Sequence, residues 1–248
     1  MHKTSEQQPR IIIESVSKTF NLRTTQSLKE LFVAWTKRKK LVNSFQALDG
    51  IDITVGEGES VAILGYNGSG KSTLLKLISG VLRPDQGRIL TRGRVAGLIE
   101  VGAGFHPDLS GRENVYLNAA ILGMSKTEID ERFDDIVAFS EIGDFIDTEV
   151  KHYSSGMFIR LAFSVAIHTE LDILLVDEVL AVGDAPFREK CKAKIRELAQ
   201  QKKTMFIVSH DIGMIKELCD RGVVIRRGKQ IFDGPVAEAV DVLKQSTR

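Results

Sequence analysis

The stretch GYNGSGKST, residues 65–73, combines glycines, a lysine and hydroxyl groups at a spacing that suits phosphate binding. Glycines let the backbone curl so that its amide groups converge on phosphate oxygens at the start of a helix. Lys71 would add a positive charge to that cradle, and the Ser72 hydroxyl would offer a ligand to Mg²⁺. The apolar run Ser60–Leu64 indicates a strand before it, and Thr73–Ser79 indicates a helix after it. The pattern predicts a phosphate-binding loop whose candidate residues are Gly65, Tyr66, Asn67, Gly68, Ser69, Gly70, Lys71, Ser72 and Thr73.

A second candidate site follows ILLV, residues 173–176, where Asp177 and Glu178 stand in succession. A buried strand that ends in a carboxylate can carry Asp177 to a Mg²⁺ ion, whose preferred ligands are oxygens. Glu178 would then be placed to polarise a water molecule as a general base. An apolar run that ends in Asp-Glu is by itself typical of any strand that meets solvent. The phosphate-binding loop upstream favours the chemical interpretation.

The phosphate-binding loop and the Asp177–Glu178 pair must be positioned by the surrounding strands and helices, whose patterns alternate along the chain. Between about Gly111 and His168 the pattern is helical with no convincing strand, so we expect a helical insertion within an α/β core. Serine–glutamate pairs three residues apart predict helix starts at Ser27, Ser110 and Ser125. The other expected strands are β-branched or apolar runs, at Ile11–Val16, Ile51–Val55, Asp172–Val176, Thr204–Val208 and Val223–Arg226.

The composition is that of a globular protein, because 43% of the 248 residues are apolar and 27% are charged. The net charge of +1 gives no overall field that would attract or exclude nucleic acid, and we expect no nucleic-acid partner. Cys191 and Cys219 have no metal-ligand spacing and indicate a reducing compartment. The polar first ten residues do not resemble a secretory signal. No apolar run approaches the roughly 20 residues that span a bilayer.

The order of these motifs, with His210 in IVSHD after the next expected strand, resembles that of ATP-binding cassette (ABC) ATPases over nearly the whole chain. The resemblance implies an α/β phosphate-loop NTPase fold with a RecA-like parallel-sheet core, a small antiparallel β-subdomain and an inserted α-helical subdomain. It implies a single domain, 1–248, with its core at roughly 1–98 and 170–248 and its helical subdomain at roughly 99–169. The implied cofactors are ATP and Mg²⁺. The implied catalytic residues are Glu178 and His210, with His210 sensing the γ-phosphate.

In that family two subunits face head to tail, and each ATP lies between the phosphate loop of one subunit and a signature motif of the other. The usual signature is LSGGQ, and the corresponding residues here are YSSGM, 153–157. Carried over, Ser154, Ser155 and Gly156 would face the partner's γ-phosphate at the start of a helix expected at Met157–Ile167. The hydroxyl, the glycine and the following helix are all retained. We therefore interpret YSSGM as a functional variant of the signature.

Three further positions follow from the resemblance. Asp184, in AVGD, stands where the family has an aspartate that crosses between subunits. Glu100 stands where most members have a glutamine that joins the Mg²⁺ site to the transmembrane partner, and its carboxylate would either bind Mg²⁺ or pair with a basic residue. Phe20 is expected to stack on adenine. Phe45 is its competitor, because the segment between the two is unusually long.

Three stretches, YSSGM, GAGFHPDLSGREN at 102–114 and EVLAVGD at 178–184, resemble the family branch that exports lipid-linked polysaccharides, O-antigens and teichoic acids across bacterial inner membranes. The resemblance implies a peripheral subunit at the cytoplasmic face of that membrane. Such a subunit forms a homodimer on binding ATP and works with integral-membrane permease subunits on a lipid-linked glycan. The alternatives are an importer ATPase and a soluble ABC ATPase outside transport. We expect no C-terminal carbohydrate-binding domain of the kind that longer members carry, and we expect a helix with an apolar stripe at 27–40.

Overall fold

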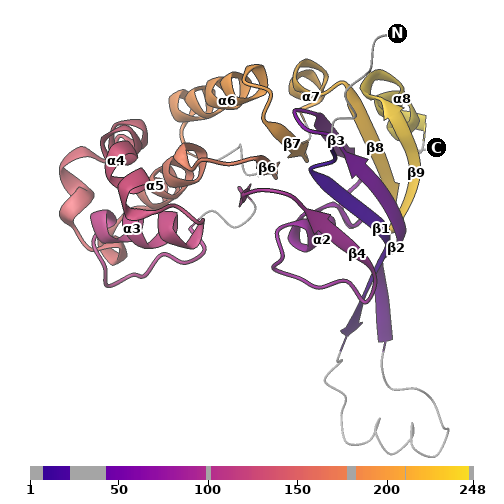
Figure 1. Ribbon diagram of the computed structural model, residues 1–248, viewed down its shortest axis with the longest axis horizontal. Coiled ribbons are helices and arrows are strands. Elements are labelled where there is room, and N and C mark those ends of the chain that lie inside the picture. Colours follow the sequence, from indigo (N-terminus) through magenta and orange to yellow (C-terminus); the bar gives the residue numbers. More distant parts are fainter. Residues whose placement is uncertain (1–7, 23–42, 99–101, 178–182, 210, 246–248) are drawn as a thin grey trace, which may run out of the picture.

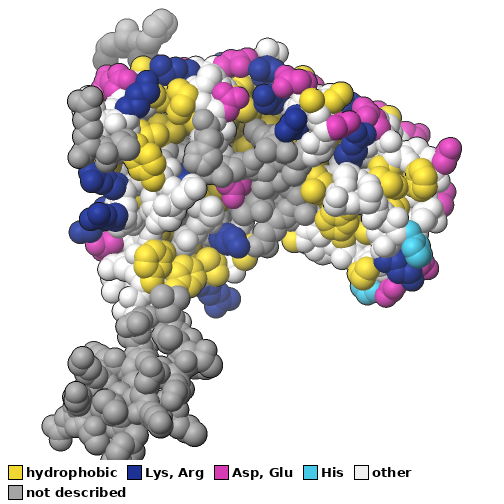
Figure 2. All heavy atoms as spheres, turned by 180° about the vertical axis from the view of Figure 1, so that it is seen from behind, with side chains coloured by type: hydrophobic (Ala, Val, Ile, Leu, Met, Phe, Trp, Pro, Cys, Tyr) yellow, Lys and Arg dark blue, Asp and Glu magenta, His cyan; other side chains and the backbone are white. Residues whose placement is uncertain are grey.

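The computed structural model describes residues 8–22, 43–98, 102–177, 183–209 and 211–245. Residues 102–168 form a group of helices, here called the helical part, beside two sheets and their covering helices, here called the sheet part (Figure 1). Figure 2 shows the same division on the reverse face, with histidine, basic and acidic side chains together at the outer end of the helical part. None of the helices in the described ranges has the length and apolar content that crossing a bilayer requires.

The larger sheet has six strands in the order β5-β6-β7-β3-β8-β9. All neighbouring pairs are parallel except β8 and β9, which are antiparallel. The central strands are buried on both faces, so β6 is a continuous apolar run and β7 is apolar after its first residue, the buried Thr204. The six strands span Val95–Gly97 (β5), Ile173–Val176 (β6), Thr204–Ile207 (β7), Ser60–Leu64 (β3), Arg221–Arg226 (β8) and Lys229–Pro235 (β9).

The smaller sheet is antiparallel and has the order β2-β1-β4. It consists of β1 (Ile11–Leu22), β2 (Asn43–Val55) and β4 (Gln86–Thr91). The pairing of β1 with β2 shifts register after Ile13, next to Ser15, whose φ of 47° is unusual for a residue with a side chain.

Apolar layers cover both faces of the larger sheet. Because successive side chains of a strand point to opposite faces, Ala62 and Leu64 of β3 join one layer and Val61 and Ile63 join the other. The first layer includes buried residues of α6 (Ala185–Gln200), α7 (Ile212–Leu218) and α8 (Val236–Gln245). The second layer includes α2 (Lys71–Ile78) and the inner face of the smaller sheet. The sheet that carries the candidate phosphate-binding loop is thus held rigidly from both sides.

The helical part has its own apolar cluster, built mainly from α3, α4 and α5. Reciprocal serine–glutamate hydrogen bonds start α3 at Ser110 and α4 at Ser125, which confirms two of the three predicted capping boxes; the third, at Ser27, lies outside the described residues. The elements are α3 (Gly111–Ile121), α4 (Lys126–Ser140), the 3₁₀ turns η1 (Gly143–Asp147) and η2 (Val150–His152), and α5 (Ser155–His168).

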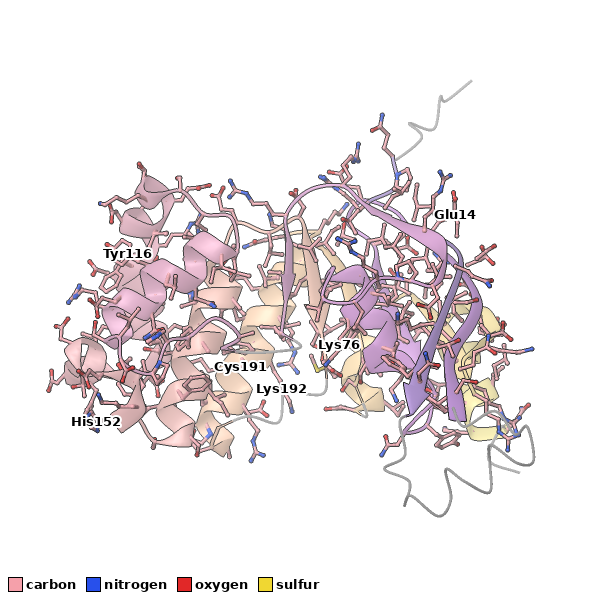
Figure 3. All side chains as sticks on the ribbon, turned by 90° about the horizontal axis from the view of Figure 1, so that it is seen from below. Glu14, Lys76, Tyr116, His152, Cys191 and Lys192 are labelled. Atoms are coloured by element: carbon pink, nitrogen blue, oxygen red, sulfur yellow. The ribbon has the colours of Figure 1, made fainter. Side chains whose placement is uncertain are left out.

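Both cysteines of the chain are buried and unpaired. Cys191 lies on the inner side of α6 (Figure 3), and Cys219 follows α7. Burial raises the pKa of both thiols to about 12. A thiolate is the reactive form of cysteine, so these thiols pack as small apolar groups and carry no chemistry.

The predicted α/β fold, with a parallel-sheet core, a small antiparallel sheet and inserted helices, is confirmed. The strands Ile11–Val16 and Ile51–Val55 prove to be parts of the longer strands β1 and β2. The strands β4, β5 and β9 were not predicted, because β4 is largely exposed and β5 is only three residues long. The predicted helix at 27–40 lies outside the described residues.

Candidate functional site

The GYNGSGKST loop connects β3 to α2, as its pattern predicts. Gly68 and Gly70 have φ angles of 78° and 113°, in the left-handed region that favours glycine. A side chain on Gly70 would also lie 2.6 Å from the Ala47 carbonyl oxygen, so the close packing of the loop against β2 requires glycine there. Within the described part of the chain, no side chain caps the N-terminus of α2, which leaves its first amide groups to face a ligand.

Lys71 bends back across the loop that precedes it. Its ammonium group donates hydrogen bonds to the carbonyl oxygens of Gly65 at 2.8 Å and Tyr66 at 3.2 Å. The side chain is 7% exposed. These hydrogen bonds hold the ammonium group against the loop, where phosphate oxygens would lie.

A pocket of about 360 Å³ opens beside the loop. Phe45, on β2, is among its lining residues and is 48% exposed. Phe20, on β1, is the direct cross-strand neighbour of Phe45, so both rings lie on the same face of the β1–β2 ribbon. Phe20 does not itself line the pocket, and its ring lies 5.8 Å from the Lys18 ammonium group. The described residues that line the pocket are Phe45, Ala47, Asn67, Gly68, Gly70, Lys71, Ser72 and Thr73.

Other elements hold the loop from outside. The Gly228 amide, in the turn between β8 and β9, donates to the Ser69 carbonyl at 3.0 Å, and the Gly228 carbonyl accepts from the Asp49 amide at 2.8 Å. The Tyr66 hydroxyl donates to the Leu243 carbonyl of α8 at 3.0 Å. The loop is therefore tied to both sheets and to α8.

Asp177 lies at the carboxyl end of β6. Pairing across the sheet sets Ala62, Ile207 and Val176 in one row, so Asp177 is level with the end of β3. One strand, β7, separates β6 from β3, which puts the two strands about 10 Å apart. A metal ion at this edge of the sheet would therefore need ligands both from the end of β6 and from the loop after β3. Among the residues that the structure describes, no group of three or more His, Cys, Asp and Glu side chains could hold a metal ion by itself.

The residues of the signature stretch begin α5. Ser154 is the N-cap, and its hydroxyl accepts a hydrogen bond from the Met157 amide at 3.1 Å. The helix starts at Ser155, two residues before the predicted start at Met157, so Ser155 and Gly156 belong to its first turn. A Cβ atom on Gly156 would have Ser154 Oγ as its nearest contact, at 3.8 Å. The start of α5 is consequently open toward solvent.

Asp184 is the N-cap of α6 and accepts a hydrogen bond from the Phe187 amide at 3.4 Å. Arg160 of α5 donates to the same carboxylate at 2.7 Å and also pairs with Glu141 at 2.9 Å. Desolvation of the Asp184 carboxyl opposes ionisation, but the hydrogen bond and charge of Arg160 outweigh it, so the pKa of Asp184 lies below its ordinary value. Arg160 thereby joins α5 to the start of α6, a contact that sequence patterns did not indicate.

Two groups of the predicted residues lie on different parts of the chain. The pocket is lined by residues between Phe45 and Thr73, whereas Ser154, Ser155 and Gly156 belong to the helical part and do not line it. In Figure 3, His152, two residues before Ser154, lies well away from Lys76 of α2. The predicted residues Glu100, Glu178 and His210 lie outside the described residues.

A parallel sheet whose strand β3 leads through a glycine-rich loop into α2 defines the phosphate-loop NTPase fold. The family model described as "ABC transporter" matches residues 48–181, more than half of the chain. The chain belongs to the ABC transporter family.

Similar curated proteins are named as an ABC transporter protein or as ATP-binding proteins of export systems. The chain is 54% identical over 193 residues to the ABC transporter protein AbcA of Aeromonas salmonicida, covering 78% of this chain and 63% of that protein. It is 45% identical over 202 residues to the O-antigen export system ATP-binding protein RfbB of Klebsiella pneumoniae, covering 82% of each. It is 42% identical over 223 residues to the teichoic acids export ATP-binding protein TagH of Shouchella clausii, covering 89% of this chain and 61% of that protein. The chain thus spans less than two thirds of the Aeromonas and Shouchella proteins.

Solved structures share the fold at lower identity. A dimeric post-hydrolysis form of the ATP-binding cassette MJ0796, bound to ADP and Pi, superposes with a TM-score of 0.69 at 22% identity, covering 91% of this chain and 98% of that one.

Proposed function

We propose that this chain is the ATP-hydrolysing subunit of an ABC transporter that exports a lipid-linked polysaccharide across the bacterial inner membrane. The observation that carries the proposal is the separation, within one chain, of two elements that could bind phosphate. The loop pocket around Lys71 and the open N-terminus of α5 lie on different parts of the molecule. In this proposal each element forms half of an ATP site. A second copy of the chain, placed head to tail, would bring its α5 to the loop pocket of the first, and two complete ATP sites would result.

In this proposal the pocket binds the nucleotide through its triphosphate. Amide groups of the loop from Gly65 to Thr73 and the Lys71 ammonium group bind the β- and γ-phosphates. Phe45 lines the pocket and is half-exposed, which favours it over its neighbour Phe20 as the ring that stacks on adenine. Phe20 would then support the Phe45 ring from the adjacent strand.

Mg²⁺ is the proposed metal cofactor, and the available donors fit it. The Ser72 hydroxyl lines the pocket, and the Asp177 carboxylate stands at the same edge of the sheet, so both offer the oxygen ligands that Mg²⁺ prefers. When bound, Mg²⁺ would neutralise charge on the β- and γ-phosphates. Glu100 remains a proposed third ligand on the grounds of its sequence position.

Hydrolysis is assigned to Glu178, next to Asp177. Its carboxylate would accept a proton from a water molecule as the water oxygen bonds to the γ-phosphorus and the bond to ADP breaks. His210 would contact the γ-phosphate and respond to its loss. From the partner subunit, the amides at the start of α5 and the hydroxyls of Ser154 and Ser155 would stabilise γ-phosphate charge, with Gly156 allowing close approach. Asp184 would contact the partner across the dimer interface.

The export substrate rests on relatives and on the signature variant. RfbB and TagH are named for export of O-antigen and of teichoic acids, and both substrates are glycans. The YSSGM signature favours this branch over an importer ATPase, which would be expected to carry LSGGQ and glutamine at position 100. A soluble ABC ATPase outside transport is the third candidate.

An apolar pocket of about 290 Å³ supports a membrane-embedded permease as partner. It lies between the sheet and helical parts, and Val81 and Ile121 at its edge are 57% and 61% exposed. Exposed apolar side chains around a pocket are typical of a protein-binding site. Binding there would hold the subunit at the cytoplasmic face of the membrane.

The hydrolysis assignment is tested by Glu178→Gln. We expect this variant to bind MgATP but to hydrolyse it at least ~100-fold more slowly, because a positioned base contributes about that much. It should also accumulate as an ATP-dependent dimer in size-exclusion chromatography. Near-normal turnover would remove Glu178 from this role, and a protein that stays monomeric with ATP would contradict the head-to-tail site.

The partner assignment is tested by Ile121→Asp. A carboxylate at the edge of the apolar pocket should prevent co-purification with the permease, because burying an unpaired charge at an interface is costly. ATP binding by the isolated subunit should be retained. Ile231→Asp on β9, where the native side chain is also exposed (43%), is the matched control and should co-purify normally. Equal co-purification of both variants would exclude this pocket as the permease site.

A further inference from the structure

GAGFHPDLSGREN, which resembles the exporter branch, is hydrogen-bonded to residues 148–151, directly before the second such stretch, YSSGM. The Gly111 amide donates to the Thr148 carbonyl at 3.1 Å, and Ser110 and Glu149 form an antiparallel bridge. The Val150 amide donates to the Leu109 carbonyl, and the Lys151 amide to the Pro107 carbonyl, each at 2.9 Å. The loop before α3 is therefore paired with the segment that leads directly into the signature.

Asn114 makes the first of these stretches rigid. This side chain of α3 is completely buried. Its amide nitrogen donates to the carbonyls of His106, Leu109 and Ser110 at 3.0, 3.1 and 2.9 Å, and its carbonyl oxygen accepts from the His106 amide at 2.7 Å. Buried polar networks with every group satisfied hold a single conformation. The loop therefore acts as a fixed support.

Tyr153 joins this support to the signature. Its hydroxyl donates to the Phe145 carbonyl of η1 at 2.7 Å, and burial raises its pKa to about 12, so it remains a hydrogen-bond donor at neutral pH. A Cβ atom on Gly111 would overlap the Tyr153 hydroxyl and would lie 2.9 Å from the Ile146 carbonyl oxygen. The ring thus fits only over a glycine at the start of α3.

The next residue after Tyr153 is Ser154, the N-cap of α5. In the first turn of α5, Phe158 packs edge-on against Phe105 with ring centroids 5.2 Å apart, and a side chain on Gly102 would lie 2.5 Å from the Phe158 ring. The start of α5 is consequently packed against the 102–111 loop at two residues, Tyr153 and Phe158.

We propose that Tyr153 is a positioning residue that fixes the direction in which α5 presents Ser155 and Gly156 to the partner's nucleotide. The inference rests on the proposed head-to-tail ATPase function and deepens it. Tyr153 touches no nucleotide. Its hydroxyl and its packing on Gly111 set where the N-cap lies, and thereby where the helix amides point. A loose helix start would weaken binding of the γ-phosphate in the dimer and leave the loop pocket of the monomer unchanged.

The first test is Tyr153→Phe in a Glu178→Gln background, in which we expect the ATP-bound dimer to accumulate. The ATP concentration that gives half-maximal dimer should rise about threefold to tenfold, as the loss of one hydrogen bond predicts. The affinity of the monomer for a fluorescent ATP analogue, measured below the dimerisation concentration, should not change. Dimerisation equal to that of the parent, or a parallel loss of monomer affinity, would overturn the proposal.

The second test uses the overlap between position 111 and the tyrosine ring. Gly111→Ala should raise the ATP concentration for half-maximal dimer at least about tenfold when Tyr153 is present. The same substitution should raise it much less in a Tyr153→Leu chain, so the two positions should be coupled in a double-mutant cycle. Additive effects would overturn the proposal. If wild type hydrolyses ATP and Glu178→Gln dimerises while the tyrosine variants have no effect, only this inference fails. If wild type has no ATPase activity, the proposed function itself fails.

Discussion

Gly156→Asp is expected to leave the fold of the chain intact and to abolish ATP hydrolysis. The added side chain would meet open space, since the nearest atom to a Cβ at this position is Ser154 Oγ at 3.8 Å. A carboxylate in the first turn of α5 also interacts favourably with the helix dipole, by about 0.3–1 kcal/mol. In the proposed dimer, however, the same carboxylate would face the γ-phosphate. We expect turnover to fall more than ~100-fold with an unchanged or slightly higher melting temperature.

Gly156→Asn is the matched control, because asparagine has the shape of aspartate without its charge. It should lose less activity than the aspartate variant, and the difference between the two should shrink at high ionic strength. An active Gly156→Asp protein would mean that the start of α5 does not face nucleotide. A large fall in melting temperature would mean that the glycine serves packing.

Lys71→Met is expected to weaken binding of ATP and ADP by about 100-fold or more. The ammonium group lies across the loop on the carbonyls of Gly65 and Tyr66, where it would neutralise phosphate charge in a largely buried setting. Hydrogen bonds between charged groups are worth about twice as much as neutral ones, and burial strengthens them further. Isothermal titration with ADP would measure the loss.

Lys76→Met is the control on the same helix, because Lys76 does not line the pocket. It should bind ADP as wild type does. Binding of adenosine, which has no phosphate, should be weak and equal in both variants and in wild type. Retained ADP affinity in Lys71→Met would contradict the assignment of the loop as the phosphate site.

Local patterns were sufficient to predict the loop, because strand, glycines, lysine and helix lie within 20 residues of each other. Strands buried on both faces, such as β6, were equally clear from their apolar runs. β4 was not predicted because it is largely exposed. β9 alternates between exposed and half-buried positions, but the exposed Ile231 beside the half-buried Phe232 hides that alternation in the sequence. The start of α5 was placed two residues late because serine and glycine in a first turn have low helix propensity.

Contacts between distant segments were not predictable in this way. Phe45 lines the pocket because β2 pairs with β1, although the two strands are far apart in the sequence. No local pattern specifies that pairing. The fit of Tyr153 over Gly111 depends on the antiparallel bridge between residues 110 and 149. Glycine is also common in turns and at helix ends for conformational reasons, so a glycine at a helix start does not by itself indicate close packing.

The two buried thiols have a practical consequence for measuring motion. With a pKa of about 12, on the order of one thiol in 10⁵ is ionised at pH 7, so maleimide dyes would react with Cys191 and Cys219 very slowly in the folded protein. A cysteine introduced at an exposed position, such as that of Phe145 on η1, would be the chain's single fast-reacting thiol. Fluorophores on the two copies of a dimer could then follow the approach of the helical parts during turnover, with both native cysteines left in place.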